Sequence, residues 1–476
     1  MHAELNIDAG SLTYAGWRRE SGLVEKMECS LKFILTEPAG TGEPLQGEAR
    51  AVLSEEDLTV APRHGEEIFI SLRDIEHIAA EDYRLELLLS SGEQLQLFHL
   101  GRAYEDFLRE LTRLRHELIS KDLLMHERQR KEGQEARLAW HGADGAVKYE
   151  GRAELRLYET GLVIFPATGD PFRIPYSSIE DVSEGDYMLT LNTDPGERLV
   201  FSMMGRGFEP FREALNEVMS ELSAKVQKTL QELLPEAGPA LIRQAAGLMR
   251  EGKAARRSDL EALSPQLWVA LEQRLDAAGL RHEYDFLKEL SRREKCCIGI
   301  KRGLMGDLTG DYIWLLMPLY SNATDKPGNA IAMAAASGKG GGRATYFFRM
   351  ADPEEYRQYR DLEALDRLAD TMITRINRCM LAINFRREPI YLSEEKLGEE
   401  QYRKYRQAVR KIPALQELRR LFIGRVFHRT PEQWEEEVQE LLHLNNISPG
   451  TWKWSGRGQE LADDECEAEP EAPAEG

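Results

Sequence analysis

Apolar and charged residues alternate along much of the first half of the chain. Between residues 153 and 157, alanine and leucine at odd positions alternate with charged residues at even positions, which is the period of a strand with one buried face. Similar short runs recur over residues 49–98 and 153–203, separated by turn residues about every 8–12 positions. This spacing predicts a small antiparallel barrel or sandwich in each stretch.

The period changes to that of a helix after Gly101 and again after Gly205. Apolar residues then recur mostly three or four positions apart and form one face of each predicted helix. These residues are Tyr104, Phe107, Leu108, Leu111, Leu114 and Leu118 in the first stretch, and Phe208, Phe211, Leu215 and Leu222 in the second. We therefore expect each barrel to be closed by a C-terminal helix.

The two stretches are copies of one another. Residues 47–118 align with residues 151–222 at a constant offset of 104 positions without a gap, and 24 of 72 positions are identical. Average composition would give about 5 identities by chance. The shared residues are glycines, apolar core positions and turns, and we interpret the repeated pairs Asp82-Tyr83 and Asp186-Tyr187 as a turn with an aromatic residue at the edge of the core. The duplication therefore concerns a fold and not a reactive centre.

A leading strand at 31–35 and another at 136–141 bring each unit to about seven strands and one closing helix. This order of elements resembles the pleckstrin-homology-like superfold (PH/GRAM-type), here in tandem over residues 27–222. Phe107 and Phe211 stand where many members carry a tryptophan. The resemblance implies either a phosphoinositide ligand or a protein ligand.

The usual phosphoinositide pocket of this family uses clustered lysine and arginine in the loop between the first two strands. Residues 36–46 contain no basic residue, and the second unit offers only Lys148 near its loop, with Asp144 close by. The resemblance therefore favours a protein partner over a phosphoinositide.

The remainder of the chain predicts helices around one further sheet, so the fold class is α+β. Strands are expected at 296–300, 312–320, 329–336 and 344–350, followed by an amphipathic helix at 362–383. Helix starts are expected at Ser258, at Ser264-Pro265 and at Thr430-Pro431. The predicted domains are a leader 1–26, barrel units 27–124 and 128–228, a helical segment 229–290, an α+β unit 291–390, a helical segment 391–455 (helical at least over 390–445) and a disordered acidic tail 456–476.

Charge and cysteine content narrow the class of protein. The net charge of -20 disfavours non-specific binding to nucleic acid or to anionic membranes over most of the surface. Five scattered cysteines indicate a reducing compartment and no disulfide framework. The sequence shows neither a signal peptide nor an apolar run of 18 residues, so we expect a cytoplasmic protein without a transmembrane segment.

Motifs that carry chemistry are not found, and we predict no catalytic, cofactor-binding or metal-binding residues. Cys296 and Cys297 are adjacent, which is not the spacing of a zinc or redox site. The glycine-rich residues 338–342 join two predicted strands, whereas a phosphate-binding loop leads into a helix. Ser393 and Lys396 have the spacing of some serine acyl-enzymes, but two intervening glutamates make a helix start the better interpretation.

Two stretches of the sequence contain a large excess of one charge. Nine basic residues and one acidic residue, Glu417, lie between positions 402 and 429, and an acidic tail follows from Asp463. A solvated helical face and a solubilising tail are the simple explanation. The alternative hypothesis is that the tail screens the basic face until a polyanionic partner displaces it. The candidate polyanion-binding residues are Arg403, Lys404, Arg406, Arg410, Lys411, Arg419, Arg420, Arg425 and Arg429.

The leading hypothesis is a non-enzymatic cytoplasmic adaptor or scaffold that binds protein partners through its tandem barrels and its C-terminal α+β unit. One alternative is binding of a polyanion or a basic protein. Tandem pleckstrin-like domains with an acidic tail are similar in outline to the middle region of histone chaperones of the FACT complex. Another alternative is an enzyme with a site in residues 295–390, and its candidate polar residues are Lys301, Asp307, Asp311 and Arg343. The sequence leaves the oligomeric state open.

Overall fold

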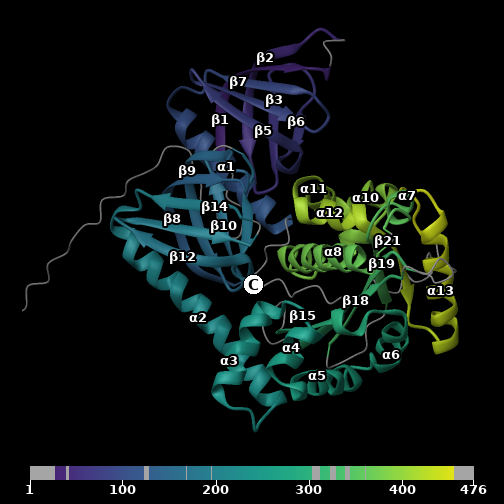
Figure 1. Ribbon diagram of the computed structural model, residues 1–476. Helices are drawn as coiled ribbons and strands as arrows, with labels where there is room; N and C mark the ends of the chain where they lie inside the picture. Colours follow the sequence, from purple (N-terminus) through teal and green to yellow (C-terminus); the bar gives the residue numbers. More distant parts are fainter. Residues whose placement is uncertain are drawn as a thin grey trace, which may run out of the picture. The chain divides into compact units, whose positions relative to one another are not determined.

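The computed structural model describes residues 27–38, 42–122, 128–167, 169–194, 196–302, 311–321, 328–337, 344–359 and 361–454. The chain divides into two compact units. The first contains residues 1–121 and 168–171, and the second contains residues 122–167 and 172–476. Figure 1 labels the helices and strands where there is room for a label. The predicted leader and acidic tail lie outside the described residues.

The first barrel is a curled antiparallel sheet closed by a helix. Its described strands follow the order β4-β3-β2-β1-β7-β6-β5. Alternate residues of each strand point inward, and Phe33, Leu58 and Leu97 meet Phe107 and Leu111 of the helix in one core. The elements are β1 (Met27–Thr36), β2 (Leu45–Leu53), β3 (Asp57–Pro62), β4 (Ile68–Ser71), β5 (Ile75–Glu81), β6 (Arg84–Leu89), β7 (Gln94–Phe98) and α1 (Tyr104–Asp122).

The second barrel repeats this topology, with the described strands in the order β11-β10-β9-β8-β14-β13-β12. Leu138, Leu155 and Phe201 pack against Phe211 and Leu215 of its closing helix. The elements are β8 (Gln129–His141), β9 (Val147–Tyr158), β10 (Gly161–Pro166), β11 (Phe172–Pro175), β12 (Ile179–Gly185), β13 (Met188–Thr193), β14 (Arg198–Ser202) and α2 (Phe208–Leu233).

The duplication read from the sequence extends to backbone detail. Every element from β3 to the first residue of α1 recurs 104 positions later, from β10 to the first residue of α2. The register of β5 against β6 shifts between Ile75 and His77, and that of β12 against β13 shifts between Ile179 and Asp181. The prediction of two tandem barrels, each with a C-terminal helix, is therefore confirmed.

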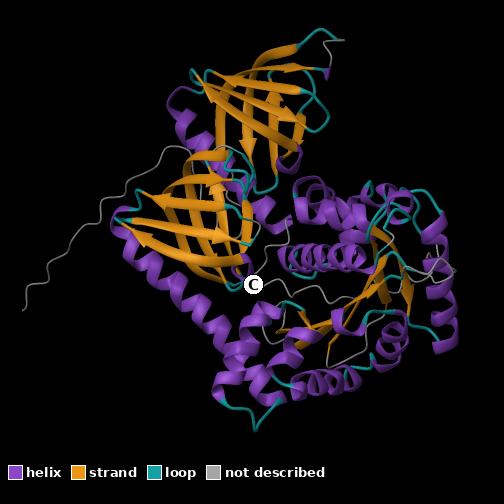
Figure 2. Cartoon of the chain, in the orientation of Figure 1, coloured by secondary structure: helices purple, strands orange, loops and turns teal. Residues whose placement is uncertain are grey.

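The rest of the second unit is built on a third antiparallel sheet, in which the described strands follow the order β15-β16-β18-β19-β20-β21. Figure 2 shows helices on both sides of this sheet. The elements are α3 (Pro239–Leu248), β15 (Ala255–Arg256), α4 (Arg257–Leu263), α5 (Pro265–Ala277), α6 (Arg281–Leu290), β16 (Cys297–Arg302), β18 (Asp311–Leu319), β19 (Ala330–Ser337), β20 (Ala344–Arg349), α7 (Pro353–Tyr356), α8 (Leu362–Ala382), α9 (Glu388–Tyr391), α10 (Glu394–Leu397), α11 (Arg403–Lys411), α12 (Pro413–Leu421), β21 (Phe422–Phe427) and α13 (Pro431–Ile447).

Both faces of the third sheet are buried. One face packs on α3 to α6 and α13, where Trp268, Tyr284 and Trp434 are almost fully buried. On the other face Trp314 of β18 meets Phe385, just after α8, with ring centroids 4.8 Å apart. Because both faces are covered, the central strands are apolar throughout and show little alternation. The predicted α+β class is confirmed.

Two local predictions for this part of the chain are wrong. The stretch 390–445, predicted as helical, contains strand β21, which pairs with β20 at the sheet edge. Helix α4 begins at Arg257, so Ser258 lies within its first turn and is not its cap. By contrast, Ser264 and Thr430 do flank helix starts with proline in the first turn, as predicted. In the described residues, no helix is both long enough and apolar enough to span a bilayer.

Candidate binding surfaces

Tyr83 and Tyr187 occupy the tips of equivalent hairpins, β5–β6 and β12–β13. Their φ angles are 58° and 54°, which is the left-handed region. A residue with a side chain loses about 1–2 kcal/mol there, and such turns prefer asparagine or glycine. Each ring touches the first residue of the closing helix, Tyr104 or Phe208, at centroid distances of 5.2 and 5.8 Å. The predicted turn is present, but Tyr83 is 72% exposed and Tyr187 73%, so core packing does not account for the tyrosines.

A second exposed residue lies beside each tyrosine. His99 and Met203 directly follow β7 and β14, with φ angles of 64° and 56°. The pairing of β6 with β7 and of β13 with β14 places them across from the two tyrosines. We define the first tip surface as Tyr83, Arg84 and His99, and the second tip surface as Tyr187, Met188 and Met203. The second is more apolar, because Met203 is 76% exposed and Met188 43%.

Acidic residues flank both tip surfaces. Glu81 and Asp82 precede Tyr83, and Glu184 and Asp186 precede Tyr187. Glu184 pairs with Arg212 of α2 at 3.0 Å. The hairpin tips thus combine aromatic or thioether side chains with a carboxylate edge, which suits a partner that presents apolar and cationic side chains.

A polar recess lies between the second barrel and the helices of the third sheet. Ser177, Asp194, Lys253, Thr374 and Arg378 contribute to its lining. Burial raises the pKa of the Asp194 carboxyl, and the nearby charges of Arg378 and Lys253 act in the opposite direction. Asp194 Oδ1 is buried without a hydrogen-bond partner. The recess has room for about one water molecule, so it is too small for a substrate.

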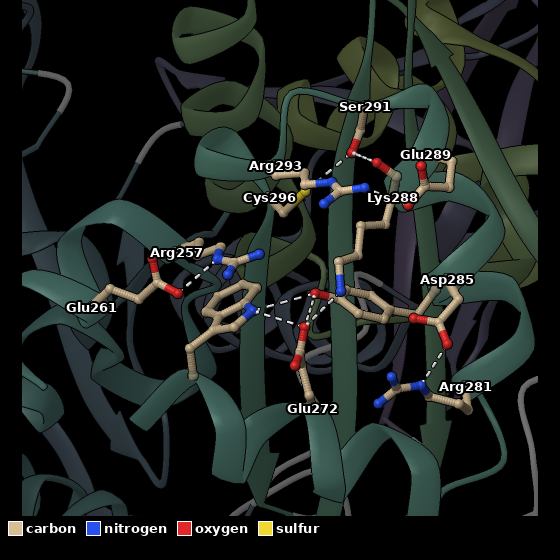
Figure 3. A network of polar contacts seen from close by, with 12 residues as sticks. Arg257, Glu261, Glu272, Arg281, Asp285, Lys288, Glu289, Ser291, Arg293 and Cys296 are labelled. Carbon is tan, nitrogen blue, oxygen red and sulfur yellow. Dashed lines mark hydrogen bonds and ion pairs between the residues drawn. The ribbon is translucent and has the colours of Figure 1, made fainter. Parts of the chain in front are cut away.

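A network around Glu272 joins α5 to α6 (Figure 3). Glu272 Oε1 accepts hydrogen bonds from Tyr284 Oη at 2.7 Å, Lys288 Nζ at 3.1 Å and Trp268 Nε1 at 3.2 Å. Burial alone would raise the pKa of Glu272, but the hydrogen bonds from Tyr284 and Lys288 outweigh it and hold the pKa below its ordinary value. Burial and the Glu272 carboxylate raise the pKa of Tyr284. Because these groups satisfy one another, the network braces two helices and presents no open ligand position.

The described cysteines are poor nucleophiles. Burial raises the pKa of the Cys29, Cys296 and Cys379 thiols to about 11 in each case, and it also raises that of Cys297. Thiols with such pKa values stay protonated at neutral pH. Among the described residues, no group of three histidine, cysteine or acidic side chains is arranged to hold a metal ion.

The residues suggested for an enzyme site are only partly described. Asp307 and Arg343 lie outside the described residues, as does the side chain of Asp311. Lys301 is buried, with its Nζ 5.5 Å from the centroid of the Phe385 ring. The prediction of an enzyme site in residues 295–390 therefore stays a prediction.

The predicted polyanion-binding residues divide into two groups. Several of them stabilise the fold. Arg406 donates hydrogen bonds to the carbonyls of Leu397 and Gly398. Arg425 is buried, and its Cζ lies 3.5 Å from the centroid of the Tyr391 ring. Arg419 likewise donates to two backbone carbonyls. Arg410, Arg420 and Arg429 are exposed, and Arg403 and Lys411 are half-buried. Arg420 is paired with Glu417 at 2.9 Å. The side chain of Lys404 is outside the described residues. Polyanion binding by these residues stays a prediction.

Comparison with known proteins identifies no family. No protein-family model matches the chain, and no curated protein matches it. Among solved structures, the chain is similar to one described as the structure of the Spt16D Pob3N heterodimer, with 19% sequence identity. The match covers 36% of this chain and 84% of that chain, with a TM-score of 0.15. At this TM-score the match does not establish the fold, which the strand order of the two sheets shows directly.

Proposed function

We propose that this chain is a non-enzymatic adaptor that binds a protein partner through the tip surfaces of its two barrels. One observation supports this most strongly: both copies hold an exposed tyrosine in the left-handed region at the same hairpin position. Strained backbone conformations that side-chain packing does not offset are common at functional sites. Tyrosine and methionine are also enriched at protein interfaces.

The partner is proposed to present apolar side chains together with lysine or arginine. The apolar groups would contact Tyr187, Met188 and Met203, and the cations would meet the carboxylates of Asp82 and Asp186 that flank the tips. The cytoplasm is the proposed location, because the four described cysteines are free thiols, which suits a reducing compartment.

The test compares partner capture by wild-type protein with capture by the double variant Tyr83→Asn and Tyr187→Asn. Asparagine tolerates the left-handed region, so the variant removes the aromatic groups while keeping the turns. We expect proteins recovered by affinity purification with the wild type to be depleted at least fivefold with the variant. Purification with and without nuclease separates direct protein partners from those that nucleic acid bridges.

Val269→Asn is the matched control, because Val269 is 51% exposed and belongs to α5, which is part of neither hairpin. This control should recover the same proteins as the wild type. If the tip variant recovers the same proteins at the same yield, the tip surfaces are not the binding sites. Circular dichroism of all three proteins confirms that the comparison is between folded chains.

A further inference from the structure

The second barrel holds the end of a helix at one edge of its sheet. The edge strand β11 contacts α8. Arg173 of β11 donates hydrogen bonds to the carbonyls of Leu381 and Ala382 at the C-terminal end of α8, at 3.3 Å in each case. Carbonyls at a helix C-terminus lack partners within the helix, so the guanidinium of Arg173 satisfies them. This edge of the second barrel is therefore an internal docking surface for a helix.

The part of α8 that faces the barrel presents a cation and an apolar side chain. Thr374, Arg378 and Leu381 line the polar recess opposite Ser177 and Asp194 of the barrel. They are four and three positions apart in the sequence, so they lie on one face of the helix. The barrel edge thus accepts a helix face on which a basic and an apolar residue are separated by about one turn.

The first barrel has the same backbone at the equivalent edge. Strand β4 lies 104 positions before β11 and is likewise an edge strand. The N–H of Ser90 donates to the carbonyl of Asp74 at 2.7 Å, and the equivalent bond in the second barrel joins Asp194 to Ser178 at 2.8 Å. The two edges therefore share their backbone hydrogen bonding and differ in their side chains.

Phe69 stands in the first barrel where the second barrel has Arg173. The alternation of β4 places Ile70 in the core and Phe69 on the outer face, where it is 72% exposed. Its cross-strand neighbour Thr59 is half-buried. Aromatic side chains are enriched at protein interfaces because they bury a large apolar area. We define the β4 surface by the residues equivalent to those that face α8 in the second barrel, namely Phe69, Arg73, Asp74 and Ser90.

Carboxylates border the β4 surface. Glu66 and Glu67 directly precede β4, and both are exposed. Asp74 is half-buried within the surface. The cation of the surface, Arg73, is paired with Glu56 at 2.9 Å. The surface therefore combines an exposed apolar ring with a border of acidic side chains, and a helix that carries apolar and basic residues is complementary to it.

We propose that the β4 surface of the first barrel binds a helix of a partner protein, as the equivalent edge of the second barrel binds α8. The partner helix presents an apolar residue that packs on Phe69. It also presents a lysine or arginine about one turn away, which meets the carboxylates of Glu66 and Glu67. Phe69 replaces the guanidinium that binds the end of α8, so the partner helix is held by its side chains and not by its terminal carbonyls.

The proposed site is separate from the tip surfaces. It lies on β4 and on the turn Leu72–Asp74 that follows it, whereas the first tip surface lies at the β5–β6 hairpin. The inference therefore does not rest on binding at the tip surfaces.

The test places the photo-cross-linker p-benzoylphenylalanine at position 69 of the full-length chain, in cells that express it. The same cross-linker at position 45 is the matched control, because Leu45 is 51% exposed in β2 of the same barrel. Sequencing of the cross-linked peptide identifies the partner segment. We expect position 69, and not position 45, to cross-link a segment with apolar residues at helical spacing and a lysine or arginine one turn away.

A synthetic peptide of the cross-linked segment then measures affinity for the purified full-length chain. The peptide should gain helical far-ultraviolet circular dichroism on binding. Phe69→Glu should weaken binding about tenfold, and the double variant Glu66→Lys and Glu67→Lys about threefold. Leu45→Glu makes the same change from an apolar to an acidic side chain and should leave the affinity unchanged. Arg173 shows that a charged side chain at this strand position is compatible with the fold.

Several results would overturn the proposal. One is the absence of a cross-link from position 69, or the same cross-linked segment from positions 69 and 45. Another is a cross-linked segment that is acidic, that gains no helix on binding, or that belongs to a second copy of this chain. Equal affinity of the wild type and Phe69→Glu for the peptide would overturn it as well. The cross-linking comparison does not depend on the folding of a charge variant.

Discussion

At the scale of single residues, Asp194 is partly buried without full hydrogen bonding, and this raises the pKa of its carboxyl. Its equivalent in the first barrel, 104 positions earlier, is Ser90, so the charge is specific to the second barrel. The carboxylate lies near Lys253 and Arg378, yet no ion pair within 4 Å joins it to either among the described contacts, and one oxygen has no hydrogen-bond partner. The charged form is therefore under-stabilised in the folded state.

Replacing Asp194 by asparagine is expected to stabilise the protein at neutral pH. Because burial raises the folded-state pKa above the unfolded one, the favourable contribution of Asp194 is present at acidic pH and is lost as pH rises through the folded pKa. We expect a gain of about 0.5 kcal/mol at pH 7, since solvent screens the exposed part of the carboxylate.

Urea unfolding of wild type and Asp194→Asn at pH 7 and at pH 4 measures this difference. The gain should shrink at pH 4, where the wild-type carboxyl approaches protonation. A variant that is less stable at pH 7, or a difference that does not change with pH, would show that Asp194 is well paired in the folded protein.

At the scale of elements, residues 449–454 attach to the end of α12 and to β21. Lys453 Nζ donates to the carbonyls of Arg419 and Phe422, and the N–H of Trp454 donates to the carbonyl of Ile423. Burial lowers the pKa of Lys453 to about 8, with further contributions from the charges of Arg349 and Arg419. Because this folded-state pKa lies below the unfolded value near 10.4, the contribution of Lys453 to stability is lost as pH falls toward 8 and grows as pH rises toward about 10.4.

The matched substitution is Lys453→Met, which keeps the length of the aliphatic chain and removes the charge. Between pH 7 and pH 9.5 the wild type should gain about 1 kcal/mol relative to the variant, after allowance for solvent screening at this exposed residue. Guanidinium unfolding at the two pH values measures the change. A constant difference between the two proteins would mean that Lys453 is fully charged in the folded state at both values.

The sheet edge gives a steric prediction. Gly424→Ala places a Cβ against Trp454. We therefore expect residues 449–454 to shift and the free energy of unfolding to fall by about 1–3 kcal/mol. Gly247→Ala in α3 is the control, because a Cβ there meets no atom within 4 Å and alanine favours a helix. Increased hydrogen exchange at residues 422–454 in the first variant alone would support this account. Equal stability of both variants would contradict it.

At the scale of the whole molecule, the duplicated barrels belong to different compact units. Phe107 and Phe211 hold equivalent positions in the two closing helices, and each is fully buried. Replacement of either by alanine should cost about 3–5 kcal/mol through loss of burial and creation of a cavity. Each substitution should destabilise its own unit.

Hydrogen exchange separates the two effects. Phe107→Ala should reduce protection over residues 45–118, while residues 149–222 keep the protection of the wild type. Phe211→Ala should do the reverse and should also affect the third sheet, which belongs to the same unit. Loss of protection in both barrels from either substitution would mean that the two units unfold as one.

The exposure of individual residues at the hairpin tips could not be predicted from the sequence. The repeated Asp-Tyr pairs were recognisable from the duplication, and a turn was the correct interpretation. Exposure of Tyr83 and Tyr187 depends on which way a hairpin tip faces. Met203 continues the alternation of Leu199 and Phe201 and was included in a predicted strand, but β14 ends at Ser202 and Met203 is 76% exposed. A comparison of its position with His99 across the repeat could have drawn attention to it.

The sequence alone determined the two barrels and their helices, because alternation, helical period and turn residues act within a few positions of one another. It also determined the third sheet over residues 297–349, where long apolar strands stand between turn residues. Strand β21 was decided only by tertiary structure, since residues 422–427 form a strand by pairing with β20 about 80 positions earlier. The burial of Arg425 and the attachment of Trp454 follow from that distant pairing, which no local pattern encodes.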